Sequence, residues 1–261
     1  MDLPKVNAHL HTPFSFSAFR DIDDALDRAV AEKVKVVGIN DFYTAEGYEE
    51  WADGCRKRGL FPLFGIEFIS LNEEDQKAGL RVNDPGNPGR TYISGKGLLQ
   101  PFKLDEPYAS ELTNVRNEAN KQVEAMCEKL NGILTGKNAS FILDIDWIKE
   151  NLTKGSVRER HLAKALRLKV YENCDDNPTC IKNLLREIFG GKELKSDTDN
   201  LAGVENEIRA NLLKSGGLAF VPETAEAFLP MQTVCKIILA AGGLPTYPFL
   251  ADDAQGNYTD F

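Results

Sequence analysis

The sequence predicts an α/β fold built from parallel βαβ units, and three observations support this prediction. The chain has 261 residues, of which 42% are hydrophobic and 27% charged, so it can bury a sizeable core and has the composition of a globular protein. Over the first seventy residues, apolar strand-like segments alternate with amphipathic helix-like segments. One of them, residues 35–41 (KVVGIND), is a continuous apolar run typical of a strand covered on both faces. Such alternation indicates parallel strands, in an open sheet or in a barrel.

Residues 5–70 supply the first three strands and two helices. The strands are predicted over 5–12 (KVNAHLHT), 35–41 and 60–70 (LFPLFGIEFIS). Asp21 is placed to cap the first helix, and Gly59 is placed to end the second. The first helix has apolar residues at helical spacing, namely Ile22, Ala25, Leu26, Ala29 and Val30.

The pattern changes after Leu71. Residues 80–98 carry turn dipeptides between short apolar stretches, which predicts a hairpin or a long loop. A helical block follows from about residue 109 to residue 241, and a fourth strand is predicted over 244–250 (LPTYPFL), ahead of a polar tail. The helices of the block are marked by an apolar face or by cap and stop residues: Leu112 to Leu130, Asn177-Pro178 to Gly190, Leu201 to Gly216, and Pro230 to Gly242.

Charge and segment composition exclude several classes of protein. Lys and Arg number 31 against 40 Asp and Glu, and the net charge of −9 disfavours general binding to a nucleic-acid backbone. No apolar run approaches about 18 residues, so no membrane-spanning helix is predicted. The first residues do not have the pattern of a signal peptide. The five cysteines form no C-x-x-C pair and are predicted to be reduced thiols in a cytoplasmic protein.

The residues that could carry chemistry gather at the carboxyl ends of the predicted strands. His9 and His11 stand two apart on the first strand, so both imidazoles project from one face. Asp41 ends the second strand and Glu67 lies on the third. Because the ends of parallel strands converge, two imidazoles and two carboxylates can meet there, a ligand set for zinc, manganese or iron. Alternatively, the carboxylates of Asp41 and Glu67 only cap the segments that follow them.

Three motifs in order resemble those of the PHP (polymerase and histidinol phosphatase) superfamily: NAHLHTPFS at 7–15, GINDFYTAEG at 38–47 and GIEF at 65–68. RERHLAKALRLK at 158–169 is similar to the helix of its small phosphoesterase branch that a His opens, and residues 227–248 resemble its helix–Gly-Gly–strand segment. The resemblance implies a PHP-type distorted (β/α)7 barrel with a metal centre that hydrolyses phosphoesters. It divides the chain into three βα units of the barrel over 1–71, an insertion of loop and helices over 72–229, and a return to the barrel with the fourth strand and the tail over 230–261.

The chain departs from the family pattern at several positions. Asn7 replaces an Asp, Phe16 stands in the first loop, Phe42 replaces the His of an Asp-His pair, and Thr246-Tyr247-Pro248 replaces Ala-His-Pro. The closing Asp-x-His motif is absent, and four predicted strands fall short of seven, so we expect an incomplete barrel and a truncated chain. The surviving residues predict one divalent ion, or two at most, held by His9, His11, Glu67 and Asp41.

The remaining candidates concern catalysis and substrate. His161 matches a His of the family pattern, and the resemblance therefore implies a catalytic role for His161 in addition to that of Asp41. His161 would act as a metal ligand or as a phosphate contact. Alternatively, it is a partly buried structural residue. Arg160, Arg90 and Lys96 are the candidate contacts for a small phosphorylated substrate, although the segment GRTYISGKG lacks the phosphate-loop pattern. The leading prediction is a divergent metal-dependent phosphoesterase. The alternatives are a PHP-like scaffold that has lost catalysis and binds a partner, and an unrelated α/β-barrel hydrolase.

Overall fold

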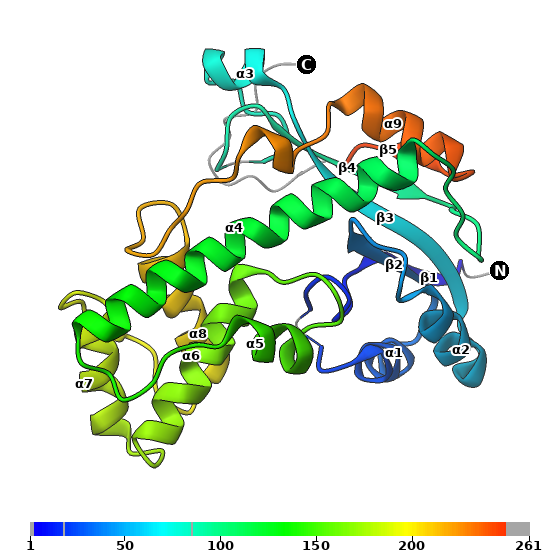
Figure 1. Cartoon of the computed structure of the whole chain (residues 1–261). Coiled ribbons are helices and arrows are strands. Elements are labelled where there is room, and N and C mark those ends of the chain that lie inside the picture. Colours follow the sequence, from blue (N-terminus) through cyan, green and yellow to red (C-terminus); the bar gives the residue numbers. More distant parts are fainter. Residues whose placement is uncertain (1–2, 18, 85, 249–261) are drawn as a thin grey trace. The chain divides into compact units, whose positions relative to one another are not determined.

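A computed structural model of the chain describes residues 3–17, 19–84 and 86–248. It divides the chain into two compact units, which are described separately. Unit 1 comprises the described residues of Met1–Asn117 and Ala225–Phe261 and contains a β-sheet, whereas unit 2, Glu118–Thr224, is helical (Figure 1).

The sheet of unit 1 confirms the prediction of parallel βαβ units. Its strands are adjacent in space in the same order as in the chain. The first three are parallel, the fourth is antiparallel to the third, and the fifth is antiparallel to the fourth. Among the described residues the sheet is open, with its first and last strands at the edges. The five strands are β1 (Lys5–Leu10), β2 (Val34–Phe42), β3 (Phe61–Leu71), β4 (Arg90–Lys96) and β5 (Leu244–Thr246).

The helices that follow β1 and β2 form for the local reasons the sequence suggests. The Asp21 carboxylate accepts a hydrogen bond from the Asp24 amide at 2.7 Å and caps the first helix. Gly59 ends the second helix with a left-handed φ of 65°, which suits a residue without Cβ. Val30, expected on the buried face, is 46% exposed. The helices of unit 1 are α1 (Ile22–Ala31), α2 (Tyr48–Arg58), α3 (Glu73–Ala78), the start of α4 (Tyr108–Gly136), the 3-10 turn η2 (Ala225–Ala227) and α9 (Met231–Ala240).

The segment after β3 folds back and pairs with β3 itself, whereas the sequence predicts a hairpin or a long loop within residues 80–98. β4 pairs with β3 in antiparallel register, so Ser94 lies opposite Glu67, and the short helix α3 occupies the connection. Sequence patterning does not reveal β4 as a strand because its segment is short, contains Gly95 and has polar Ser94 and Lys96 on one face. The fourth predicted strand is confirmed as β5, which ends at Thr246, while residues 249–250 and the tail lie outside the described residues.

The two faces of the sheet differ in character. Along β3, Ile66 and Phe68 are almost fully buried and join a core with Trp51 of α2 and Ile238 of α9. Because side chains alternate along a strand, Glu67 lies on the opposite face. One face of the sheet therefore holds the hydrophobic core of unit 1, and the other presents polar groups.

Unit 2 has a separate hydrophobic core made by helices, as the predicted helical block implies. Asn177 caps α7 by accepting hydrogen bonds from the amides of Thr179 and Cys180, and Pro178 occupies the first helical position. No helix in the described part of the chain has the length and apolar character needed to cross a membrane. Besides the rest of α4, the helices are α5 (Ile145–Leu152), α6 (Glu159–Asn173), α7 (Pro178–Ile188), α8 (Leu201–Ile208) and the π-helix η1 (Arg209–Leu213).

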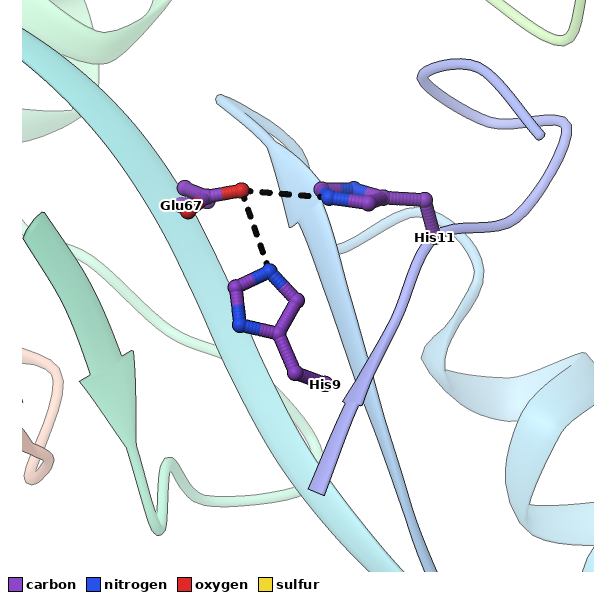
Figure 2. A group of neighbouring side chains, drawn as sticks. All are labelled: His9, His11 and Glu67. Atoms are coloured by element: carbon purple, nitrogen blue, oxygen red, sulfur yellow. Dashed lines mark hydrogen bonds and ion pairs between the residues drawn. The ribbon is translucent and has the colours of Figure 1, made fainter. Parts of the chain in front are cut away.

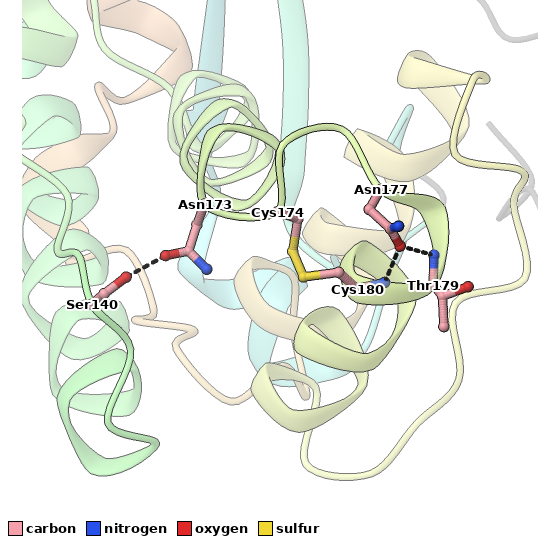
Figure 3. The surroundings of a disulfide bond; sticks show 6 residues. All are labelled: Ser140, Asn173, Cys174, Asn177, Thr179 and Cys180. Atoms are coloured by element: carbon pink, nitrogen blue, oxygen red, sulfur yellow. Dashed lines mark hydrogen bonds between the residues drawn. A yellow bond between two sulfur atoms is a disulfide. The ribbon is translucent and has the colours of Figure 1, made fainter.

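The prediction that all five cysteines are reduced is wrong for one pair. Cys174 follows α6, Cys180 lies on α7, and the two form a disulfide with their Cα atoms 5.6 Å apart (Figure 3). Residues 174–177 form a short turn between the end of α6 and the start of α7, and this turn brings the cysteines within bonding range although they lack C-x-x-C spacing. Cys55, Cys127 and Cys235 are free thiols.

His161 lies on α6, where it caps the start of the helix. Its Nδ1 accepts a hydrogen bond of 2.9 Å from the Arg158 amide, the contact that Glu or Gln makes at this position of a capping box. The side chain is buried, and burial lowers the pKa of His161 to about 4.

The close approach of β1 to β2 at Gly38 gives the first prediction. A Cβ there would lie 2.6 Å from the backbone oxygen of Ala8, so Gly38→Ala should destabilise the protein by about 2 kcal/mol. Gly132→Ala, at an open position of α4, is the matched control and should leave stability unchanged or raise it by up to about 1 kcal/mol. Urea unfolding followed by circular dichroism measures both, and equal stability of the two variants would contradict the prediction.

The buried imidazole of His161 gives the second prediction. Because its pKa is about 4 in the folded state and 6.5 when unperturbed, the unfolded state binds a proton first as the pH falls. Its contribution to stability is therefore fully present above pH 6.5 and is lost between pH 6.5 and 4, by roughly 3 kcal/mol. His161→Gln retains a capping acceptor but cannot titrate, so its stability should fall less than that of the wild type between pH 7 and 4.5. Parallel pH profiles of unfolding for the two proteins would show that His161 is not responsible.

Candidate metal centre

Two histidines from the first strand and a glutamate from the third converge at one point. His9 lies on β1, His11 follows it, and Glu67 lies on β3. Glu67 Oε2 is 3.3 Å from His9 Nε2 and 3.2 Å from His11 Nε2 (Figure 2). The three potential ligand atoms lie within 4.8 Å of one another, and these residues are the one such group in the described part of the chain. The structure thus brings together three of the four residues that the sequence nominates as metal ligands.

An irregularity in β1 contributes to this convergence. The parallel register of β1 with β2 shifts between Asn7 and Leu10, so the chain at His9 departs from regular pairing. The His9 amide instead donates to the side-chain oxygen of Asn7 at 3.3 Å. Irregularities of this kind re-aim side chains, and the two imidazole rings come to lie with their centroids 5.2 Å apart.

The carboxyl group of Glu67 is buried but remains the ionised member of the group. Burial raises its pKa, but the neighbouring imidazoles, above all the hydrogen bond from His11, outweigh this effect and leave the pKa below its usual value. Only 4% of the residue is exposed. Glu67 therefore offers a carboxylate oxygen to the point that His9 and His11 also face.

Aromatic rings fix the orientation of His11. Its imidazole packs against both Phe16, with centroids 4.7 Å apart, and Phe42, with centroids 5.0 Å apart, and the two phenyl rings also contact each other, with centroids 5.8 Å apart. Its Nδ1 is buried and has no hydrogen-bond partner among the residues that the structure describes, while Nε2 faces Glu67. The two phenylalanines occupy positions at which the family pattern has polar or ligating residues, and a phenyl ring cannot bind a metal.

This donor set fits one divalent ion. Two imidazole nitrogens and one carboxylate oxygen on a common side form a familiar three-ligand arrangement that leaves further positions open. With Phe16 and Phe42 packed on His11, the described residues provide no ligand cluster for a second ion.

A second polar group adjoins His9 on the same face of the sheet. Lys96 Nζ donates to Asn40 Oδ1 at 2.7 Å and to the Ala8 carbonyl at 2.8 Å. Asn40 Nδ2 lies 3.1 Å from both Ser94 Oγ and His9 Nε2. Burial lowers the pKa of Lys96 to about 8. Lys96 is a substrate contact predicted from the sequence, whereas Asn40 and Ser94 are not predicted, although the position of Asn40 directly before Asp41 at a strand end is a usable signal.

Asp41 is buried apart from the three-residue group. Its carboxylate accepts hydrogen bonds from the Thr12 amide at 2.7 Å, the Thr12 hydroxyl at 2.5 Å and the Ser15 hydroxyl at 2.6 Å. Burial raises the pKa of Asp41, and these donors oppose the rise. In the structure Asp41 therefore anchors the loop that follows His11.

The other sequence-predicted residues lie elsewhere. The Arg90 guanidinium, at the start of β4, lies 4.9 Å from the centre of the Phe228 ring. Arg160 and His161 belong to α6 in unit 2, where His161 caps the helix.

Comparisons with known proteins agree with this architecture. A solved protein from Bifidobacterium adolescentis, named as a metal-dependent phosphoesterase, superposes with a TM-score of 0.61 at 16% identity over 97% of this chain and 73% of its own. An amidohydrolase from Chromobacterium violaceum, solved with sulfate and no metal, superposes with a TM-score of 0.60 at 16% identity over 93% of this chain and 66% of its own. At this identity the likeness concerns the fold.

Sequence comparison gives the family. The chain is 28% identical over 185 residues to the PolC-type DNA polymerase III of Ureaplasma parvum serovar 3, a match that takes in 67% of this chain and 12% of the polymerase. The chain thus spans about an eighth of that relative's length. The model of the PHP domain matches residues 7–152, which is more than half of the 261 residues. The chain therefore belongs to the PHP domain family.

Proposed function

We propose that this protein is a metal-dependent phosphoesterase that acts on a small phosphorylated substrate. The observation that carries the proposal is the convergence of His9 Nε2, His11 Nε2 and Glu67 Oε2 at the carboxyl-terminal edge of the sheet. The name of the B. adolescentis protein is consistent with it. The polymerase match supports no polymerase activity here, because it takes in 12% of that protein.

The residues of the site have distinct tasks in this proposal. His9, His11 and Glu67 would hold a divalent ion, which would supply Lewis-acid chemistry for a water molecule and a phosphoryl oxygen. Glu67 provides the negative charge, and the phenyl rings of Phe16 and Phe42 keep the His11 imidazole oriented. Asp41 supports the loop after His11 through Thr12 and Ser15. The ion is zinc, manganese or iron, since all three bind imidazole and carboxylate.

The substrate contacts and the remaining catalytic roles extend the proposal. Lys96, which is joined to His9 through Asn40, is the cation proposed to bind a phosphate group, a task that suits an ammonium group, and the same role for Arg90 and for Arg160 remains a prediction from the sequence. Roles in catalysis for Asp41 and His161, beyond the hydrogen bonds described, and a cytoplasmic location remain predictions from the sequence.

One observation favours the alternative of a binding scaffold without catalysis. Phe16 and Phe42 stack on His11 where the family pattern has polar or ligating residues, which leaves three ligands in the described chain. A site of this kind could retain a metal without hydrolysing phosphoesters, so metal binding and hydrolysis are measured separately.

The third prediction tests the proposed function by elemental analysis and a phosphoester assay. Protein purified without chelator or metal-affinity resin should contain about one equivalent of zinc, manganese or iron and should hydrolyse p-nitrophenyl phosphate. His9→Ala and Glu67→Gln each remove a ligand and should lower the bound metal at least tenfold and abolish hydrolysis. Glu32→Gln is the matched control, because this carboxylate is 70% exposed at the end of α1, and it should retain both.

Two outcomes oppose the proposal in different ways. If His9→Ala loses the bound metal but the wild type hydrolyses no phosphate mono- or diester, the binding scaffold replaces the phosphoesterase as the proposed function. If the folded wild-type protein takes up no zinc, manganese or iron, the proposal of a metal site is wrong.

A further inference from the structure

A cavity of about 470 Å³ lies beside the start of α2. Its wall comes from three segments of the chain: residues 43–49 after β2, residues 100–104, and residues 109–116 at the start of α4. All three segments belong to unit 1, so the cavity is a feature of this unit by itself. A cavity of this volume suits a small molecule.

The cavity is separate from the candidate metal centre. The ring of Tyr48, which lines the cavity, packs on Phe64 of β3 with centroids 5.0 Å apart. Because side chains alternate along a strand, Phe64 lies on the same face of β3 as Ile66, and Glu67 lies on the opposite face. The cavity therefore lies on the side of the sheet that holds the hydrophobic core, and a molecule bound there would be a second ligand.

Aromatic side chains form part of the wall, which includes Tyr43, Tyr48 and Phe102. The rings of Tyr48 and Phe102 meet at 81° with centroids 6.0 Å apart and so form a corner. Tyr48 is almost fully buried behind the cavity, whereas Phe102 is half-buried. The faces of aromatic rings are electron-rich, and they attract organic cations.

The ionised side chains around the cavity have a net negative charge. The guanidinium of Arg116 is paired with the carboxylate of Glu46, so these two charges offset each other. Glu49 also lines the cavity, is exposed and forms no ion pair with another described residue. Glu49 and Glu50 lie in the first turn of α2, where they already supply the negative charge that the start of a helix favours. The cavity therefore favours a cation over an anion.

We propose that this cavity binds an organic ammonium cation whose charged nitrogen is surrounded by methyl or methylene groups. The apolar groups of such a cation pack on the rings of Tyr48 and Phe102, and its charge is attracted by the Glu49 carboxylate. A hydrated inorganic ion has no apolar groups to place against the rings. The binding requires no metal ion, so the inference is independent of the proposed phosphoesterase.

The fourth prediction compares choline with 3,3-dimethylbutan-1-ol, in which a carbon atom replaces the charged nitrogen. The two probes have the same shape, so a difference in affinity reports the charge. Titration into the ¹⁵N-labelled protein at constant chloride concentration should shift the amide signals of Tyr48, Glu49 and Phe102. Choline should bind with a Kd of about 1 mM or lower, and about fivefold or more tightly than the alcohol.

Two variants separate the contribution of the carboxylate from that of the ring. Glu49→Gln, at an exposed position, should weaken the binding of choline about threefold and leave that of the alcohol unchanged. Phe102→Leu keeps an apolar side chain but removes the aromatic face, so it should weaken choline about fivefold and the alcohol by less than about twofold. Asp53→Asn is the matched control on the same helix, because its side chain is 51% exposed and lies outside the cavity, and it should leave both affinities unchanged.

Several outcomes would overturn the inference. Affinities of the two probes that agree within about twofold would show that the cavity does not recognise the charge. Amide shifts confined to the surroundings of His9 and Glu67 would place choline at the metal centre instead, and unchanged choline binding by both variants would exclude the proposed contacts. Circular dichroism identifies a variant that does not fold, in which case the other variant and the comparison of the two probes on the wild type decide.

Discussion

The parallel pairing of β1, β2 and β3 is the constraint on which the candidate site depends. β2 lies between its neighbours in a register that places Phe42 opposite Glu67, and β1 approaches so closely that Gly38 faces the backbone of Ala8. Because parallel strands end at one edge of a sheet, His9 and Glu67, which are 58 residues apart in sequence, become neighbours. The order and register of the strands therefore bring the residues of the site together.

Asp41 and Glu67 are both buried carboxylates at this edge, but their surroundings give them different roles. Asp41 is surrounded by hydroxyl and amide donors from Thr12 and Ser15 and stabilises the loop after β1. Glu67 faces the imidazoles of His9 and His11 and keeps its pKa low in spite of burial. Both are almost inaccessible to solvent, so the difference lies in their partners: Asp41 is satisfied by neutral donors, whereas Glu67 is directed at groups that also bind cations.

The sequence alone predicted the elements that have local causes. The cap of α1 at Asp21, the end of α2 at Gly59 and the start of α7 at Asn177-Pro178 follow from residues within one turn of each helix end. It also indicated the group of His9, His11 and Glu67, because period-two alternation and the convergence of parallel strand ends are general properties of such sheets.

Features that depend on partners distant in the chain became known from the folded structure. β4 is a strand because β3 provides its ladder, although its own residues form a weak strand pattern. Cys174 and Cys180 are bonded because two helix ends meet, and Asp41 is a loop anchor because Thr12 and Ser15 turn toward it. Hydrogen bonds and disulfides require particular atoms at particular distances. A one-dimensional pattern gives the face and the end of a strand on which a side chain lies, but folding determines the atom that it meets there.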